Sequence, residues 1–232
     1  MYLYGLETIG TILLSLIGFG AVLFAQIRIN SSYSKYKQVM SRKGMSGCEV
    51  ARKILDANGL SNIHVVEVKG ELSDHYDPTR KVVRLSSDIF HGTSIASISV
   101  AAHECGHAIQ DKENYTFMRV RSALVPVVNF ISYVGYFISI FSFVVGVMGY
   151  LKIGILILLA TVLFQLVTLP VEFNASKRAK VQMEKLGIAD SSELEGVSSM
   201  LGAAAMTYVA SLLSTIMNLL RLLLMFSNRD ND

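Results

Sequence analysis

Near the middle of the chain, two histidines and a glutamate stand at a spacing typical of metal sites. His103, Glu104 and His107 form the pattern H-E-x-x-H. Residues four apart lie on one face of a helix, so both imidazoles can reach the same ion. Neutral imidazole suits zinc, and a catalytic zinc keeps an open position for water beside three protein ligands. Because Glu104 can take a proton from that water, the pattern predicts a metal-dependent hydrolase.

The residues around this motif favour a helix rather than a loop. Apolar and small residues fill positions 95–102, and Thr93 or Ser94 can cap a helix that ends near Lys112. Gly106 has no side chain, so another backbone or a substrate can come close. The alternative is a chance match on an amphipathic helix whose histidines face solvent.

Long apolar stretches dominate the rest of the 232 residues. Hydrophobic residues make up 52% of the chain, and its mean hydropathy is +0.46, both high for an ordinary soluble domain. The stretches cover residues 3–27, 124–150, 153–171 and 200–226, and a bilayer is spanned by roughly 20 residues. The fourth either crosses the membrane or lies partly against the catalytic region. A cleaved signal peptide is the alternative for the first, but no basic residues precede it and it is too long.

Basic residues near the ends of these stretches predict their orientation. Only Lys152 lies between the second and third stretch. The other basic residues that flank the first three stretches fall on one side: Arg28, Lys35, Lys37, Arg42, Lys43, Lys112, Arg119, Arg121, Lys177, Arg178, Lys180 and Lys185. Since basic residues mark the cytoplasmic side, we expect the N-terminus outside and the motif inside the cell.

Glu172 is the candidate for the third metal ligand. The third apolar stretch returns to the side that carries the histidines, and Glu172 follows it directly. Ala175, Ser176 and Ala179 share the helix face of Glu172 and are small, which would let the motif helix pack against it. The alternative is an ordinary acidic residue at the start of a surface helix.

Between the first two apolar stretches, the sequence predicts a small α+β region. Ser46 and Glu49 have the spacing of a capping box, and Gly59 stands where that helix should end. Residues 63–68 and 82–85 are rich in Val and Ile, and the turn-rich segment 70–78 joins them. We expect two antiparallel strands, with an edge on which an extended peptide could add as a further strand.

The chain resembles the YugP-like membrane zinc metallopeptidases of bacteria over nearly its whole length. Residues 103–110 (HECGHAIQ) and 169–176 (LPVEFNAS) carry the resemblance, together with segments 49–56, 73–78, 121–126 and 207–210. More distantly, residues 172–176 are similar to the E-F-x-A-D segment of HtpX-like and CAAX-prenyl-type membrane proteases. There the glutamate is the third zinc ligand, so the resemblance implies this role for Glu172. Ser176 departs from that pattern, because those relatives carry Asp at this place.

Five further residues are weaker candidates for transition-state or substrate contacts. His75 and Tyr76 could stabilise an oxyanion. The simpler interpretation is that they are turn residues whose rings already have hydrogen-bond partners. Asn174 and Arg178 could bind a substrate backbone or support the metal ligands, but Arg178 equally suits a basic membrane anchor. Tyr208 lies in an apolar helix, where its phenol needs a partner, and core packing is the alternative.

Together these features predict a mostly α membrane protein with three to four transmembrane helices. A small α+β zincin-like cytoplasmic domain would carry the HExxH motif on a helix. The expected parts are residues 1–27 (first transmembrane helix), 28–121 (catalytic region), 122–171 (transmembrane hairpin), 172–199 (cytoplasmic segment with the third ligand) and 200–232 (C-terminal hydrophobic helix).

The predicted function is that of a zinc-dependent endopeptidase in the bacterial cell membrane, with one Zn²⁺ per chain. Its partners would be the lipid bilayer and a membrane or membrane-proximal protein substrate, and we expect no nucleic acid. The alternative is a non-catalytic membrane protein with a structural zinc, but such a zinc takes four protein ligands and only three are evident. A transporter is disfavoured because the apolar stretches lack interior acids or bases of the kind that mark ion pathways. An intramembrane protease is disfavoured because charged residues closely follow the motif.

Overall fold

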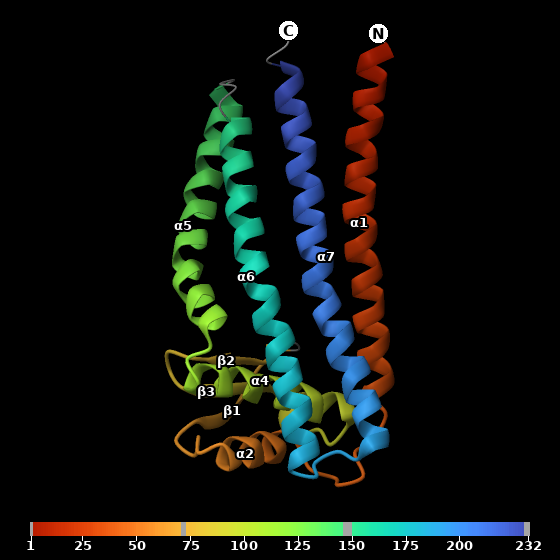
Figure 1. The fold of residues 1–232 in the computed structure, drawn as a ribbon, viewed down its shortest axis with the longest axis vertical. Coiled ribbons are helices and arrows are strands. Elements are labelled where there is room, and N and C mark those ends of the chain that lie inside the picture. Colours follow the sequence, from red (N-terminus) through yellow and green to blue (C-terminus); the bar gives the residue numbers. More distant parts are fainter. Residues whose placement is uncertain (1, 71–72, 146–149, 230–232) are drawn as a thin grey trace. The chain divides into compact units, whose positions relative to one another are not determined.

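The computed structural model describes residues 2–70, 73–145 and 150–229 (Figure 1). Within these described residues the chain is mostly helical, with one small sheet. In order, the elements are α1 (Tyr2–Lys37), α2 (Gly47–Ala57), β1 (His64–Val68), β2 (His75–Asp77), β3 (Val82–Ser86), α3 (Ser87–His91), α4 (Ile95–Lys112), α5 (Thr116–Val145), α6 (Tyr150–Lys185) and α7 (Ser191–Arg229).

The chain divides into two compact units, and the long helices contribute residues to both. The first, here the membrane unit, comprises Met1–Gln26, Val120–Leu169 and Met206–Asp232. The second, here the motif unit, comprises Ile27–Arg119 and Pro170–Ala205. The H-E-x-x-H motif and Glu172 both belong to the motif unit.

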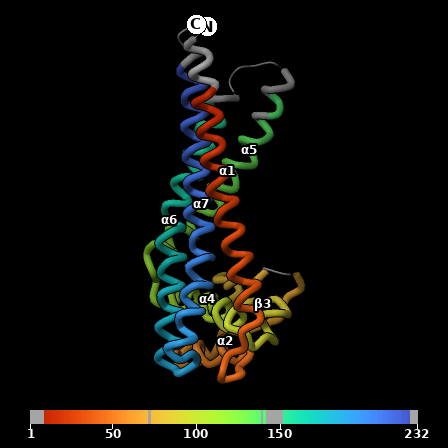
Figure 2. Tube along the Cα trace, turned by 90° about the vertical axis from the view of Figure 1, so that its right-hand side faces the viewer, coloured from red at the N-terminus to blue at the C-terminus, as the bar shows by residue number. Residues whose placement is uncertain are grey.

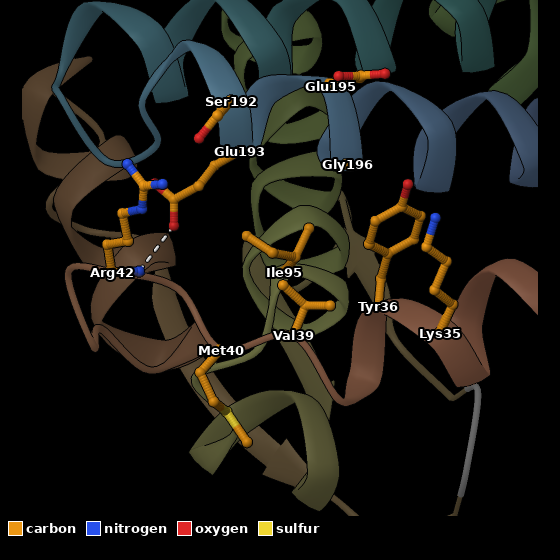
Figure 3. Close-up of a pocket in the computed structure, with 10 residues that line it drawn as sticks. All are labelled: Lys35, Tyr36, Val39, Met40, Arg42, Ile95, Ser192, Glu193, Glu195 and Gly196. Carbon is orange, nitrogen blue, oxygen red and sulfur yellow. Dashed lines mark hydrogen bonds between the residues drawn. The ribbon is translucent and has the colours of Figure 1, made fainter.

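Among the residues that the structure describes, four helices are long and apolar enough to cross a membrane, in agreement with the predicted three to four. These candidate spans are Ile9–Lys37, Thr116–Ile138, Lys152–Lys185 and Ser191–Ser227, so the fourth apolar stretch qualifies by length and composition. Within the membrane unit, α1 and α7 lie side by side (Figures 1 and 2), and a Cβ on Gly18 would lie 3.2 Å from Ser214. Many large apolar side chains of this unit are exposed, including Phe19 and Phe130, as expected of a surface that faces lipid.

The sheet of the motif unit has the strand order β1-β3-β2. β1 runs parallel to β3, with His64 opposite Val82, whereas β2 is antiparallel to β3, with His75 opposite Arg84. The prediction that residues 63–68 and 82–85 pair antiparallel is therefore wrong. The segment between them is long enough for a crossover, and it contributes its own strand, β2, on the other side of β3.

The strands and helices of the motif unit pack together around a hydrophobic core. The predicted capping box at the start of α2 is confirmed, since Ser46 and Glu49 exchange hydrogen bonds. Gly59, just beyond α2, has a φ of +64°, a conformation in which glycine is favoured. Ser94 caps α4 by accepting a hydrogen bond from the Ser97 amide. α4 is buried along most of its length and packs against α2, so the motif helix is a core element.

Candidate metal centre

Two helices of the motif unit bring together three side chains that could hold a metal ion. α4 carries His103 and His107, and α6 carries Glu172. The Oε2 atom of Glu172 lies 3.3 Å from Nε2 of His103 and 3.5 Å from Nε2 of His107. Potential ligand atoms of the three residues all lie within 4.8 Å of one another. The group is enclosed, with Glu172 only 2% and His107 only 8% exposed.

These distances fit a zinc ion. Zinc bonds to imidazole nitrogen and carboxylate oxygen are about 2.0–2.1 Å long, so neighbouring ligand atoms around a tetrahedral zinc are about 3.3 Å apart. The two nitrogen–oxygen distances of 3.3 and 3.5 Å match this edge length. Two neutral imidazoles and one carboxylate are also a common donor set of catalytic zinc, which leaves a fourth position for water.

The charges around His107 favour a bound cation. Burial disfavours the imidazolium form of His107, but a hydrogen bond to Glu172 and the negative charges of Glu104 and Glu172 outweigh it and raise its pKa. The negative field that stabilises a proton on this imidazole would also stabilise a dication beside it. A metal and a proton therefore compete for the same position.

Gly106 allows α4 and α6 to approach closely at the ligands. A Cβ placed on Gly106 would lie 2.5 Å from the carbonyl oxygen of Ala175 and 3.1 Å from its Cα, which is too close for any real side chain. Ala175 and Ala179 of α6 are fully buried. The small residues at these positions thus set the distance between the histidines and Glu172.

Replacing Gly106 with Ala should push the two helices apart. We expect the free energy of unfolding to fall by about 1–3 kcal/mol, as is usual for overpacked cores, and zinc binding to weaken. Thermal unfolding and zinc content in detergent measure the two effects. Gly202→Ala is the matched control, because nothing lies within 4 Å of a Cβ on this glycine of α7. There the added methyl group should be neutral or stabilising, and equal behaviour of the two variants would contradict the packing argument.

The ring nitrogens that face away from Glu172 also have polar neighbours. Nδ1 of His103 lies 3.2 Å from the Ser176 hydroxyl, and Nδ1 of His107 lies 3.0 Å from Oε1 of Gln110. Such outer contacts orient metal-binding histidines. Ser176, which stands where the distant relatives carry Asp, thus contacts a histidine through a neutral hydroxyl group.

Glu104 lies beside the cluster and is fixed by the sheet. Its side chain is buried, and Oε2 accepts a hydrogen bond of 2.9 Å from the backbone N–H of Tyr76 in β2. The edge strand of the sheet therefore holds the acidic group of the motif. This arrangement puts a carboxylate close enough to the candidate metal site to act electrostatically on His107.

Comparison with known proteins agrees with this geometry. A family model described as "Putative neutral zinc metallopeptidase" matches residues 11–227. The chain belongs to this family. It is 45% identical over 222 residues to the "Putative membrane protease YugP" of Bacillus subtilis (strain 168), an alignment that covers 95% of this chain and 99% of that protein. No solved structure matches it.

Three of the weaker candidates, Tyr76, His75 and Tyr208, do not belong to the cluster of possible metal ligands. The phenol of Tyr76 donates a hydrogen bond of 2.7 Å to Asp111, and burial raises its pKa, followed in effect by Asp111. Nδ1 of His75 lies 2.7 Å from the carbonyl oxygen of Ser73, and this histidine is exposed. Tyr208 belongs to the membrane unit. For Tyr76, the structure thus shows a backbone contact with Glu104 and a phenol directed to Asp111.

Asn174 and Arg178 follow Glu172 on α6. Asn174 Oδ1 accepts hydrogen bonds from Gln110 and from Arg178, and Arg178 also forms an ion pair of 2.7 Å with Glu113. The H-E-x-x-H pattern itself assigns no role to Gln110. Its position three residues after His107, on the same helix face, was the available signal. The Tyr76 amide was also missed, because a backbone group leaves no mark in the residue pattern.

Proposed function

We propose that this metallopeptidase is a zinc-dependent endopeptidase that cleaves membrane or membrane-proximal proteins at the cytoplasmic face of the bacterial cell membrane. The observation that carries the proposal is the three-ligand cluster of His103, His107 and Glu172 with the carboxylate of Glu104 beside it. Within the part of the chain that the structure describes, the cluster contains three metal-binding side chains. A structural zinc would usually take four, so this count favours catalysis over the non-catalytic alternative.

The residues of the chain have separate tasks in peptide hydrolysis. A zinc ion held by the three ligands would supply the Lewis acid that activates water and polarises the scissile carbonyl. Glu104 takes a proton from the attacking water, whose oxygen bonds to the carbonyl carbon. As the C–N bond breaks, Glu104 returns the proton to the leaving nitrogen. The Tyr76 amide keeps the carboxylate of Glu104 in place for both transfers.

The edge of the sheet supports an extended peptide as the substrate. β2 is an edge strand of the sheet, and the N–H group of Tyr76 donates its hydrogen bond to Glu104 rather than to the neighbouring strand β3. In an antiparallel pair, such a residue also directs its carbonyl group outward, where a substrate amide could bind it. This arrangement supports a zincin-like organisation of the motif unit. Substitutions along this edge should slow cleavage while the zinc content stays unchanged, and equal loss of both would contradict it.

The distribution of basic residues supports the cytoplasmic location. The predicted orientation places the N-terminus outside and the motif unit inside the cell. Cys48 belongs to the motif unit and is half-buried, whereas Cys105 is buried. A membrane-impermeant thiol reagent should therefore label Cys48 in inverted vesicles and spare it in intact cells, and the opposite result would reverse the orientation.

Metal removal tests the function directly. Protein purified in detergent should contain about one zinc per chain and cleave an unstructured protein substrate. A chelator should abolish cleavage, and added zinc should restore it, because the ligands remain in place on α4 and α6. Zinc binding without cleavage of any tested peptide would favour the structural alternative.

A further inference from the structure

A buried amide connects His107 to the helix that carries Glu172. Gln110 is fully buried, and its Oε1 lies 3.0 Å from Nδ1 of His107. Its Nε2 donates hydrogen bonds to the carbonyl oxygen of Val171, at 2.8 Å, and to Oδ1 of Asn174, at 3.0 Å. Val171 directly precedes Glu172, so the same amide contacts one metal ligand and the backbone next to another.

The contact with Val171 fixes which way the Gln110 amide points. A backbone carbonyl can only accept a hydrogen bond, so the NH₂ group must face Val171. The carbonyl oxygen of the Gln110 side chain then faces His107 and can only accept. Nδ1 of His107 must therefore carry the hydrogen. A neutral imidazole has one N–H, which leaves the lone pair of Nε2 directed toward Glu172.

Asn174 gives an independent check of this orientation. The guanidinium group of Arg178 can only donate, and its Nε lies 2.6 Å from Oδ1 of Asn174. The side-chain oxygen of Asn174 thus occupies the position between Arg178 and Gln110, and it requires a donor from Gln110. The ion pair of Arg178 with Glu113 holds the guanidinium group from its other side. The backbone carbonyl of Val171 can only accept a hydrogen bond, and the guanidinium group of Arg178 can only donate one. Both therefore impose the same orientation on the Gln110 amide.

We propose that Gln110 is the positioning residue that holds His107 in the Nδ1–H tautomer with Nε2 free for the metal. Asn174 and Arg178 keep the Gln110 amide in this orientation. The inference rests on the proposed metal site, and it assigns Gln110 a task that packing alone does not explain. By binding Val171 as well, Gln110 fixes the imidazole relative to the backbone that carries Glu172.

Gln110→Met tests this role, because methionine has a similar length and volume but neither the amide donor nor the amide oxygen. Zinc affinity, measured by competition with a chelator, should fall by about 10- to 100-fold, as is usual when an outer partner of a metal-binding histidine is lost. Gln182→Met is the matched control. It removes an amide of α6 in the same unit that binds Asn58 instead, and it should keep wild-type affinity.

A second measurement separates positioning from simple packing. In the metal-free wild type, at a pH where His107 is neutral, ¹⁵N NMR of labelled histidine should show the hydrogen on Nδ1, and Gln110→Met should populate the Nε2–H form. An Nε2–H tautomer in the wild type would overturn the inference. Unchanged zinc affinity in Gln110→Met would also overturn it. So would a metal-free Gln110→Met variant that unfolds at a lower temperature while the tautomer of His107 stays unchanged, because Gln110 would then contribute packing alone. Failure of the wild type to bind zinc would refute the proposed function instead, and the tautomer would still decide the role of Gln110.

Discussion

Replacing Glu104 with Gln should lower the rate of peptide cleavage by about 100- to 10,000-fold, the usual contribution of a general base. Gln has nearly the same shape, and its side-chain oxygen can still accept the hydrogen bond from the Tyr76 amide. It cannot take a proton from water. Zinc content should stay at the wild-type value, because Glu104 is not one of the three clustered ligands.

The measurement is cleavage of one substrate by wild type and variant at matched zinc content. Glu67→Gln is a suitable control, since this exposed glutamate of β1 belongs to the same unit and binds His91 at 3.2 Å. It should cleave at the wild-type rate. Retained activity in Glu104→Gln would assign the proton transfer to another group, whereas loss of zinc together with activity would show that Glu104 supports the metal site itself.

Local patterns explain why much of the site could be located from the sequence. Helix periodicity depends only on neighbouring residues, so the shared face of His103 and His107 and a cap at Thr93 or Ser94 could be predicted. The position of Glu172 required topology, because the third apolar stretch had to return to the side of the motif. The structure brings these three side chains together on α4 and α6.

Other features depend on contacts between distant segments and could not be predicted. The direction of β1 relative to β3 is set by how the chain between them crosses over, and the apolar pattern of a short strand is the same in both directions. The contact of Tyr76 with Glu104 joins a backbone amide to a residue of another element. Gln110 was recognisable as a neighbour of His107, but its orientation follows from Val171 and Asn174 on α6.

Replacing Glu172 with Ala should abolish stoichiometric zinc binding. The carboxylate is one of three clustered ligands and supplies the only negative charge among them. Zinc affinity should therefore fall by more than the roughly 100-fold that is lost at most when a residue supporting a metal-binding histidine is replaced. Zinc per chain in detergent-purified protein measures the effect. Glu184→Ala, an exposed position near the end of the same helix, should keep about one zinc per chain.

The pH dependence of zinc binding gives this prediction a second readout. The hydrogen bond and charge of Glu172 help to raise the pKa of His107 above its ordinary value. Since a proton on His107 excludes the metal, wild-type affinity should fall as the pH drops through this raised pKa. In Glu172→Ala the residual affinity should be weaker at every pH, and its fall should begin at a lower pH. Full zinc retention in Glu172→Ala would place the third ligand elsewhere, and the proposed protease mechanism would then lack the open three-ligand site on which it depends.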